Sequence, residues 1–178
     1  QSPLNGKVGI GHTRWATHGK VNEANAHPHQ SHKVCVVHNG TITNSQILKE
    51  ELHKFNYDFN SETDTEVIAC LIDHFLKENP TPKEAVQKAL KKLEGSYALA
   101  ILFSGEENLI IGARKDSPLV VGYGEEGLLC LGSDIPAIAG VAQECSFLEE
   151  NDIVEISNSS FSVFNIVDWT QQARFVHG

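Results

Sequence analysis

The chain has 178 residues, of which 40% are hydrophobic and 21% charged, and 14 Lys and Arg against 23 Asp and Glu give a formal net charge of −9. This length suits one domain over residues 1–178 that buries roughly 70% of its unfolded surface. The acidic balance argues against a nucleic-acid partner, which needs clustered Lys and Arg. No apolar run approaches the roughly 20 residues of a membrane span, and no signal peptide opens the chain, so we expect a cytoplasmic protein without membrane contact.

The first part of the chain is predicted to hold two strands around a long loop. Lys7–Thr13 is an apolar run typical of a strand, and Arg14–Lys33 then continues without usable periodicity. A structureless loop of that length in a compact domain is usually functional. Lys33–His38 is a short apolar run typical of a buried strand, and it ends in the turn signal Asn39-Gly40.

Three helices are predicted next. Asn44–Phe55 has a helical stripe at Ile47, Leu48, Leu52 and Phe55, with Asn44 as N-cap. Thr63–Glu66 is a capping-box pattern that opens a second helix, which runs to Leu76. Thr81–Glu84 is another capping box, with proline at the first helical position of a third helix. That helix is predicted to end at Leu93, and Lys88, Lys91 and Lys92 are expected on its solvated face.

After Gly95 the pattern changes to short apolar or alternating runs separated by Gly, Asn and Ser turns. The predicted strands are Tyr97–Phe103, Leu109–Ala113, Leu119–Gly122, Leu128–Gly132, Ile153–Ser157 and Phe161–Ile166. One short helix interrupts them near Ile135–Gly140. Strands, then helices, then many strands predict an α+β layered domain with a mostly antiparallel sheet, rather than a doubly wound parallel sheet.

The four cysteines, Cys35, Cys70, Cys130 and Cys145, are widely spaced in or beside apolar runs and form no CxxC. We expect buried free thiols in a reducing compartment rather than a disulfide framework. The sequence opens with Gln1-Ser2-Pro3-Leu4 and contains no methionine. This opening suggests a piece of a longer protein.

Histidines cluster near the start of the chain: His12, His18, His27, His29, His32 and His38 fall within the first 38 residues. Imidazoles are common zinc ligands, so a metal-binding or regulatory module is one hypothesis. However, the sequence has no HExxH and no CxxC partner, and hydrogen bonds that brace a loop explain most of these histidines better. We therefore predict no metal and no cofactor.

Three further features could belong to a functional site, and each has an ordinary structural alternative. Arg14 follows the first predicted strand and presents a fork of donors suited to a carboxylate or phosphate, although it could form a surface salt bridge. Asn39-Gly40 could be a plain hairpin turn, but an amide side chain beside a glycine N–H is also the equipment of an oxyanion hole. Asp64 could simply complement the dipole at a helix start.

The order and wording of these pieces resemble one family. The motifs that carry the resemblance are GIGHTRWATHG, NAHPH, VVHNG, SETDTEV, GSYALA, SPLVVG, SDIPA and FLEENDIVEI. Together they resemble the glutaminase domain of the glucosamine-6-phosphate synthases, which are class II amidotransferases of the N-terminal-nucleophile hydrolase type. The resemblance covers essentially the whole chain. Amidophosphoribosyltransferases, the alternative within enzymes, share the HNG-type turn and the TDTE-type helix start but differ in the first loop.

The resemblance implies the chemistry of glutamine hydrolysis. In the family an N-terminal cysteine attacks the glutamine side-chain amide, and the ammonia released passes to a C-terminal sugar-isomerase domain. The resemblance places the glutamine α-carboxylate on Arg14, its α-ammonium on Asp64, and the oxyanion on the Asn39 side chain and the Gly40 N–H. Trp15, Thr17 and His18 would shape the glutamine pocket.

The family's domain begins with Cys-Gly-Ile, which this sequence does not contain. Each of the four cysteines is internal and lacks the free α-amine that serves as base. We therefore expect the 178-residue chain alone to be catalytically incompetent. The implied fold is an αββα four-layer sandwich lacking its first strand and helix, and the edge left open could make the chain a homo-oligomer.

Overall fold

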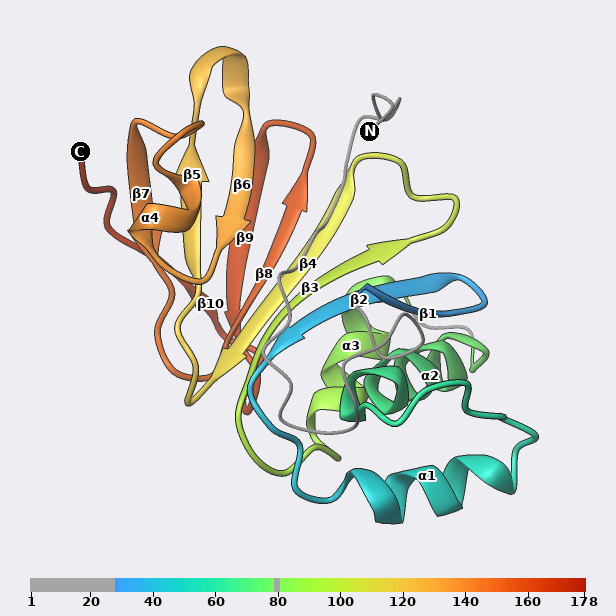
Figure 1. The fold of residues 1–178 in the computed structure, drawn as a ribbon. Helices are drawn as coiled ribbons and strands as arrows, with labels where there is room; N and C mark the ends of the chain where they lie inside the picture. Colours follow the sequence, from blue (N-terminus) through green and yellow to red (C-terminus); the bar gives the residue numbers. More distant parts are fainter. Residues whose placement is uncertain (1–27, 79–80) are drawn as a thin grey trace.

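The computed structural model describes residues 28–78 and 81–178. The predicted strand Lys7–Thr13 therefore lies outside the described residues, as does most of the predicted loop that follows it. Within the described ranges, two antiparallel sheets lie face to face and helices cover their outer faces (Figure 1). Within the same ranges, no helix has the length and apolar character needed to cross a membrane.

The larger sheet has seven strands in the order β1-β2-β3-β4-β8-β9-β10, and all neighbours are antiparallel. Its strands are β1 (His29–Ser31), β2 (Val34–Asn39), β3 (Tyr97–Phe103), β4 (Leu109–Lys115), β8 (Asp152–Ser157), β9 (Ser160–Asn165) and β10 (Gln171–Gln172). In the β2–β3 ladder, His38 faces Leu99 and Asn39 faces Ala98. The ladder thus runs to the last residue of β2.

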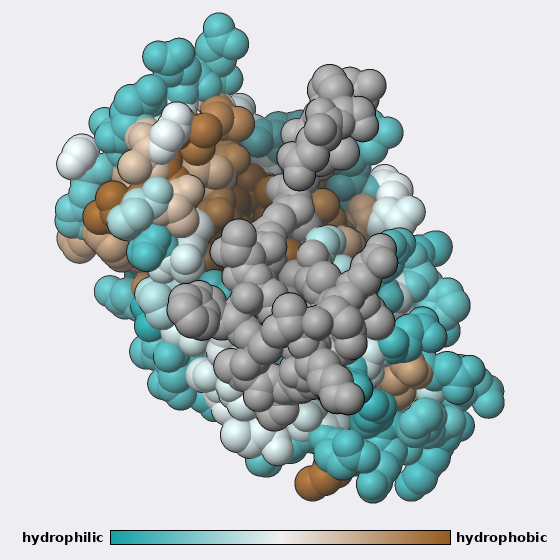
Figure 2. Space-filling view, in the orientation of Figure 1, coloured by the Kyte–Doolittle hydropathy of each residue, from teal (hydrophilic) through white to brown (hydrophobic). Residues whose placement is uncertain are grey.

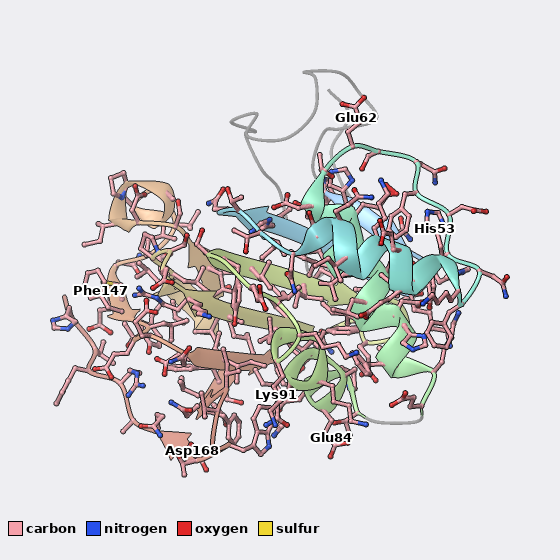
Figure 3. The ribbon with its side chains drawn as sticks, turned by 90° about the horizontal axis from the view of Figure 1, so that it is seen from below. His53, Glu62, Glu84, Lys91, Phe147 and Asp168 are labelled. Carbon is pink, nitrogen blue, oxygen red and sulfur yellow. The ribbon has the colours of Figure 1, made fainter. Side chains whose placement is uncertain are left out.

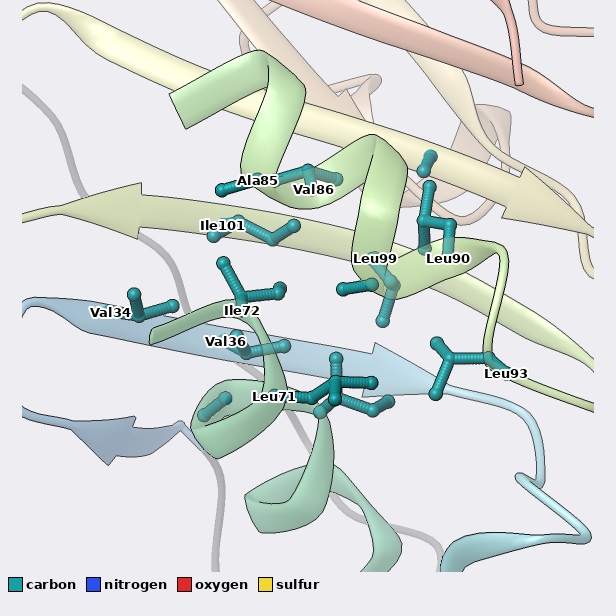
Figure 4. Packing of buried hydrophobic residues seen from close by; sticks show 14 of the residues in the cluster. Val34, Val36, Leu71, Ile72, Ala85, Val86, Leu90, Leu93, Leu99 and Ile101 are labelled. Atoms are coloured by element: carbon teal, nitrogen blue, oxygen red, sulfur yellow. The ribbon is translucent and has the colours of Figure 1, made fainter. Parts of the chain in front are cut away.

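Three helices cover one face of this sheet: α1 (Ser45–His53), α2 (Asp64–Leu76) and α3 (Pro82–Leu90). Every residue of α2 from Asp64 to Asp73 is buried, which makes α2 the central helix of this layer. Figure 4 shows the core beneath it, where α2 and α3 side chains meet residues of β2 and β3. The core residues labelled there are Val34, Val36, Leu71, Ile72, Ala85, Val86, Leu90, Leu93, Leu99 and Ile101.

The second sheet has three strands in the order β6-β5-β7. They are β5 (Val120–Tyr123), β6 (Leu129–Gly132) and β7 (Glu144–Phe147). Val121 packs with Val154 and Val163 of the larger sheet, whereas its neighbour Val120 packs with Ile138 of helix α4 (Ile135–Ile138). Alternate residues of β5 therefore face the sheet interface and the outer helix, and the predicted α+β architecture of four layers is confirmed.

Exposed apolar side chains gather around the smaller sheet (Figure 2). Leu128 precedes β6, Phe147 lies on β7, and Ile135 and Val141 belong to α4 and the turn after it. An isolated antiparallel β-bridge pairs Cys145 of β7 with His177. Self-association through an open edge stays a prediction.

Two predicted capping boxes have different outcomes. At Thr81 the box forms: the Glu84 N–H donates to the Thr81 hydroxyl, and the Glu84 carboxylate accepts from the Thr81 N–H. At Thr63 the predicted box is wrong, since that hydroxyl bonds to His29 Nε2 at 2.9 Å and makes no cap bond. Glu66 instead accepts from the Asn60 N–H. The Thr63 hydroxyl thus bonds to a residue distant in the sequence and not to the first turn of its own helix.

The N-cap predicted at Asn44 is also used differently. Asn44 occupies the cap position of α1, but its amide donates to the Lys92 carbonyl and accepts from the Glu94 N–H. The predicted apolar stripe is narrower than expected, because Ile47 and Phe55 are exposed while Leu48 and Leu52 are buried. Asn44 thus joins α1 to the segment after α3.

The basic cluster is exposed as predicted, but α3 ends at Leu90 and not at the predicted Leu93, so Lys91 and Lys92 lie beyond the end of the helix. Lys88, Lys91 and Lys92 are all exposed, as is Glu84 in the first turn (Figure 3). Three short strands were not predicted. β1 is polar and lies inside the predicted loop, and β7 and β10 have only four and two residues. The four cysteines are free, as predicted, but only Cys70 and Cys145 are buried, whereas Cys35 and Cys130 are half-buried.

Candidate active site

The predicted oxyanion turn lies at the end of β2, against the segment that leads into β3. Asn39 is exposed at the last position of the β2–β3 ladder, and Gly40 adopts a φ of 119°. A Cβ at Gly40 would lie 2.3 Å from the Ser96 carbonyl oxygen, so only glycine fits this turn. The missing side chain lets the backbone after Asn39 lie directly on Ser96.

The loop that follows is held to the same segment by hydrogen bonds to the backbone and side chain of Ser96 and to the backbone of Glu94. The Thr41 N–H donates to the Ser96 hydroxyl at 3.1 Å, and the Ser96 N–H donates to the Thr41 carbonyl at 2.9 Å. The Thr43 N–H donates to the Glu94 carbonyl at 2.9 Å. A loop fixed by these three hydrogen bonds is the kind of rigid backbone that electrostatic stabilisation of a developing charge requires.

The carboxylate of Asp64 is fixed beside this turn. Asp64 is the first residue of α2 and is 6% exposed. Its Oδ2 accepts a hydrogen bond of 2.8 Å from the Ile42 N–H, while Oδ1 lies 3.8 Å from Nδ1 of His38. The fold therefore brings a buried carboxylate to the end of β2.

His38 joins the turn and the carboxylate, and the sequence did not single it out for this place. The ring is 4% exposed, with Nδ1 3.1 Å from the Thr65 hydroxyl and Nε2 3.3 Å from the Ser96 carbonyl oxygen. The available signal was alternation along β2, because Val34, Val36 and His38 share the face that packs on α2. A polar residue at such a position requires hydrogen-bond partners.

Other buried polar contacts brace α2 without forming a reactive group. Ser61, Thr63 and His29 form one hydrogen-bonded chain, and the Tyr57 hydroxyl donates to Asp73 Oδ2 at 2.7 Å. Burial of the hydroxyl, and then its hydrogen bond to Asp73, raise the pKa of Tyr57. These groups link the loop before α2 and the edge strand β1 to the helix.

The internal thiols are poor candidates for a nucleophile. Burial raises the pKa of Cys70 to about 11, and burial also raises the pKa of Cys35 and of Cys130. These three thiols are therefore protonated at neutral pH, whereas thiolate is the reactive form.

Four of the predicted pocket residues, Arg14, Trp15, Thr17 and His18, lie outside the described residues, and their roles stay predictions. The same holds for His12 and His27 of the histidine cluster. Among residues 28–78 and 81–178, no three His, Cys, Asp or Glu side chains are grouped so as to hold a metal ion.

Comparison with known proteins defines the class. The model of the glutamine amidotransferase domain family matches residues 12–140, which is most of the chain, and the chain belongs to that family. Two curated relatives are glutamine–fructose-6-phosphate aminotransferases (isomerizing), from Mesorhizobium japonicum at 49% identity and from Zymomonas mobilis at 52%. Each match covers 93% of this chain and 27% of the relative. The resemblance inferred from the motifs is confirmed.

Solved structures support the fold. One similar structure is the glutamine phosphoribosylpyrophosphate amidotransferase from B. subtilis, with a TM-score of 0.74, 24% identity, and coverage of 88% of this chain and 34% of that one. A second, the allosteric regulatory enzyme of purine biosynthesis, has a TM-score of 0.73 and 25% identity over the same shares. The sandwich described above is thus the fold of these two structures as well.

Proposed function

We propose that this chain is the glutamine-hydrolysing part of a glutamine–fructose-6-phosphate aminotransferase. The observation that carries the proposal is the attachment of the buried Asp64 carboxylate to the loop after Asn39-Gly40, through the Ile42 N–H. Glutamine has charged groups at one end and a neutral amide at the other. A site for glutamine therefore needs a fixed anion and a fixed cation for its charged end, and uncharged hydrogen-bond donors for its side-chain amide.

The proposed roles follow that division. Asp64 binds the α-ammonium and Arg14 the α-carboxylate, while Trp15, Thr17 and His18 shape the pocket. The Asn39 amide and the Gly40 N–H donate to the oxygen of the side-chain amide as it becomes an oxyanion.

The nucleophile in this proposal is an N-terminal cysteine of the full-length protein. Its thiolate bonds to the amide carbon, and the tetrahedral intermediate collapses as the leaving nitrogen takes a proton carried by the α-amine and departs as ammonia. Water then attacks the thioester carbon, which releases glutamate and restores the thiol. Asn39 and Gly40 serve both steps, because each passes through an oxyanion.

The chain spans about a quarter of the length of the curated relatives it matches, so the fate of the ammonia belongs to the proposal. We place its consumption in a C-terminal sugar-isomerase domain, where it aminates fructose-6-phosphate to glucosamine-6-phosphate. The four free thiols suit a cytoplasmic protein, because reducing compartments keep cysteines unpaired.

A phosphoribosylpyrophosphate amidotransferase is the second candidate, because the B. subtilis enzyme of that name has a similar fold. Sequence identity favours the first candidate, with 49% and 52% for the aminotransferases against 24% for the B. subtilis enzyme.

One assay separates the candidates. The full-length protein is supplied with glutamine and either fructose-6-phosphate or phosphoribosylpyrophosphate, and glutamate and the aminated sugar are quantified. We expect glutamate together with glucosamine-6-phosphate in the first mixture. Amination of phosphoribosylpyrophosphate alone would select the second candidate, and absence of glutamate from both mixtures would contradict the glutaminase assignment.

A further inference from the structure

His38 contacts both halves of the proposed site. Its Nε2 lies 3.3 Å from the carbonyl oxygen of Ser96, the residue on which Gly40 rests. Its Nδ1 lies 3.1 Å from the hydroxyl of Thr65, the residue after Asp64. One ring on β2 therefore contacts the segment under the oxyanion turn and the first turn of α2.

The Ser96 contact fixes the tautomer of this ring. A backbone carbonyl can only accept, so Nε2 must carry the proton and donate it to Ser96. In the neutral ring, Nδ1 is then the acceptor and the Thr65 hydroxyl donates to it. The two nitrogens thus have different tasks that different substitutions can remove separately.

Each contact stabilises one half of the site. Ser96 exchanges two hydrogen bonds with Thr41, directly after Gly40, so a bond from Nε2 to its carbonyl restrains the backbone beneath the turn. Thr65 is 1% exposed and sits beside Asp64, so a bond to its hydroxyl restrains the first turn of α2. Residues held in this way keep a site preorganised.

We propose that His38 is a positioning residue for glutamine hydrolysis. It holds the oxyanion turn through Nε2 and Ser96, and it holds the ammonium-binding Asp64 through Nδ1 and Thr65. The inference rests on the proposed function, because it assumes the roles given there to Asn39, Gly40 and Asp64. A histidine that only fills the core would affect both halves together, whereas this arrangement predicts that they separate.

Two variants of the full-length protein make that separation measurable. The amide nitrogen of glutamine reaches the position of Nε2, so His38→Gln retains the bond to Ser96 and loses the one to Thr65. The amide of asparagine occupies the position of Nδ1, so His38→Asn retains the contact with the Thr65 hydroxyl and loses the hydrogen bond to the Ser96 carbonyl. Steady-state glutamine hydrolysis gives kcat and KM for each, and thermal unfolding reports folding.

We expect His38→Gln to raise the KM for glutamine by about 3- to 10-fold with kcat little changed, since one hydrogen bond is lost. We expect His38→Asn to lower kcat by a similar factor with KM little changed. Thr65→Val, which removes only the hydroxyl, should reproduce the KM effect and covers the case in which a His38 variant fails to fold. Ser146→Ala removes a buried hydroxyl bonded to Tyr123 in the smaller sheet and serves as the matched control.

Equal changes of kcat and KM in both His38 variants, no change in either, or an unchanged KM in Thr65→Val would overturn the inference. Asp64→Asn and Asn39→Ala, measured in parallel, separate this failure from that of the proposed function. If those two change KM and kcat respectively while the His38 variants show no separation, only the role of His38 is wrong. If those two have no effect, the proposed site itself is wrong.

Discussion

The backbone N–H of Ile42 donates a hydrogen bond of 2.8 Å to Oδ2 of Asp64, which ties the loop after β2 to the first residue of α2. The bond uses one carboxylate oxygen of a residue that is 6% exposed. It fixes the direction of the carboxylate relative to the Asn39-Gly40 turn. The two proposed ends of the glutamine site are therefore parts of one rigid unit.

Asp64→Asn removes the negative charge while keeping an oxygen that can accept from Ile42. We expect the KM for glutamine to rise at least about tenfold, because hydrogen bonds to charged groups contribute about 1.5–3 kcal/mol. The free energy of unfolding should change little, since the hydrogen bond from the Ile42 N–H is kept. Steady-state kinetics and thermal unfolding of the full-length protein check both points, and an unchanged KM would remove Asp64 from ammonium binding.

Gly40→Ala places a methyl group 2.3 Å from the Ser96 carbonyl oxygen at a φ of 119°. An unfavourable backbone conformation alone costs about 1–3 kcal/mol. Because the methyl group also clashes with Ser96, we expect the free energy of unfolding to fall by more than this, and kcat to fall as well. Gly105→Ala is the matched control, because its φ is 88° and a Cβ there meets nothing within 4 Å. Equal unfolding temperatures for the two variants would show that contact with Ser96 does not constrain the turn.

Glu150 provides a pH dependence of stability. The Asp116 backbone N–H, together with the Arg114 guanidinium, holds the pKa of this carboxyl below its usual value of 4.5. The lowered pKa stabilises the fold above that value, and the contribution is lost as pH falls through the folded-state pKa. Because Glu150 is 48% exposed, we expect about 0.2–1 kcal/mol.

Thermal unfolding of the unmodified protein and of Glu150→Gln at several pH values tests this contribution. The unmodified protein should be the more stable at pH 7, and the difference should shrink as pH falls below 4.5. A difference that stays constant with pH would mean that the charge of Glu150 contributes nothing.

The 178-residue chain by itself should release no ammonia from glutamine, while the full-length protein should. The three thiols with raised pKa values, Cys35, Cys70 and Cys130, should react slowly with iodoacetamide at pH 7.5 and rapidly after unfolding. Ammonia release and mass spectrometry of the labelled peptides provide the two readouts. Turnover by the isolated chain would show that an internal group can act as the nucleophile.

Local patterns in the sequence predicted the elements well where local partners decide the outcome. The Thr81 capping box forms because its partner, Glu84, is three residues away on the same helix. The same pattern at Thr63 fails because His29, 34 residues earlier in the chain, bonds to the hydroxyl. Strand β1 escaped prediction because its three residues are polar and its pairing with β2 is what orders them.

The candidate site follows the same rule. Asn39-Gly40 and Asp64 could be named from their motifs, but their attachment through Ile42 could not. The position of His38 depends on Ser96, 58 residues away, and no local pattern predicts that pairing. The sequence therefore identified these residues individually, but the contacts between them depend on the folded structure.

The most direct test of the proposed oxyanion turn is the kinetics of Asn39→Ala in the full-length protein, with Asn39→Asp as a variant of the same shape that lacks the amide donor. One oxyanion donor contributes about 2.7–4 kcal/mol to transition-state stabilisation. Both variants should therefore lower kcat for glutamine hydrolysis by about 100- to 1,000-fold and leave KM within a few-fold of its original value. A raised KM with kcat unchanged would contradict the assignment and make Asn39 a residue of substrate binding alone.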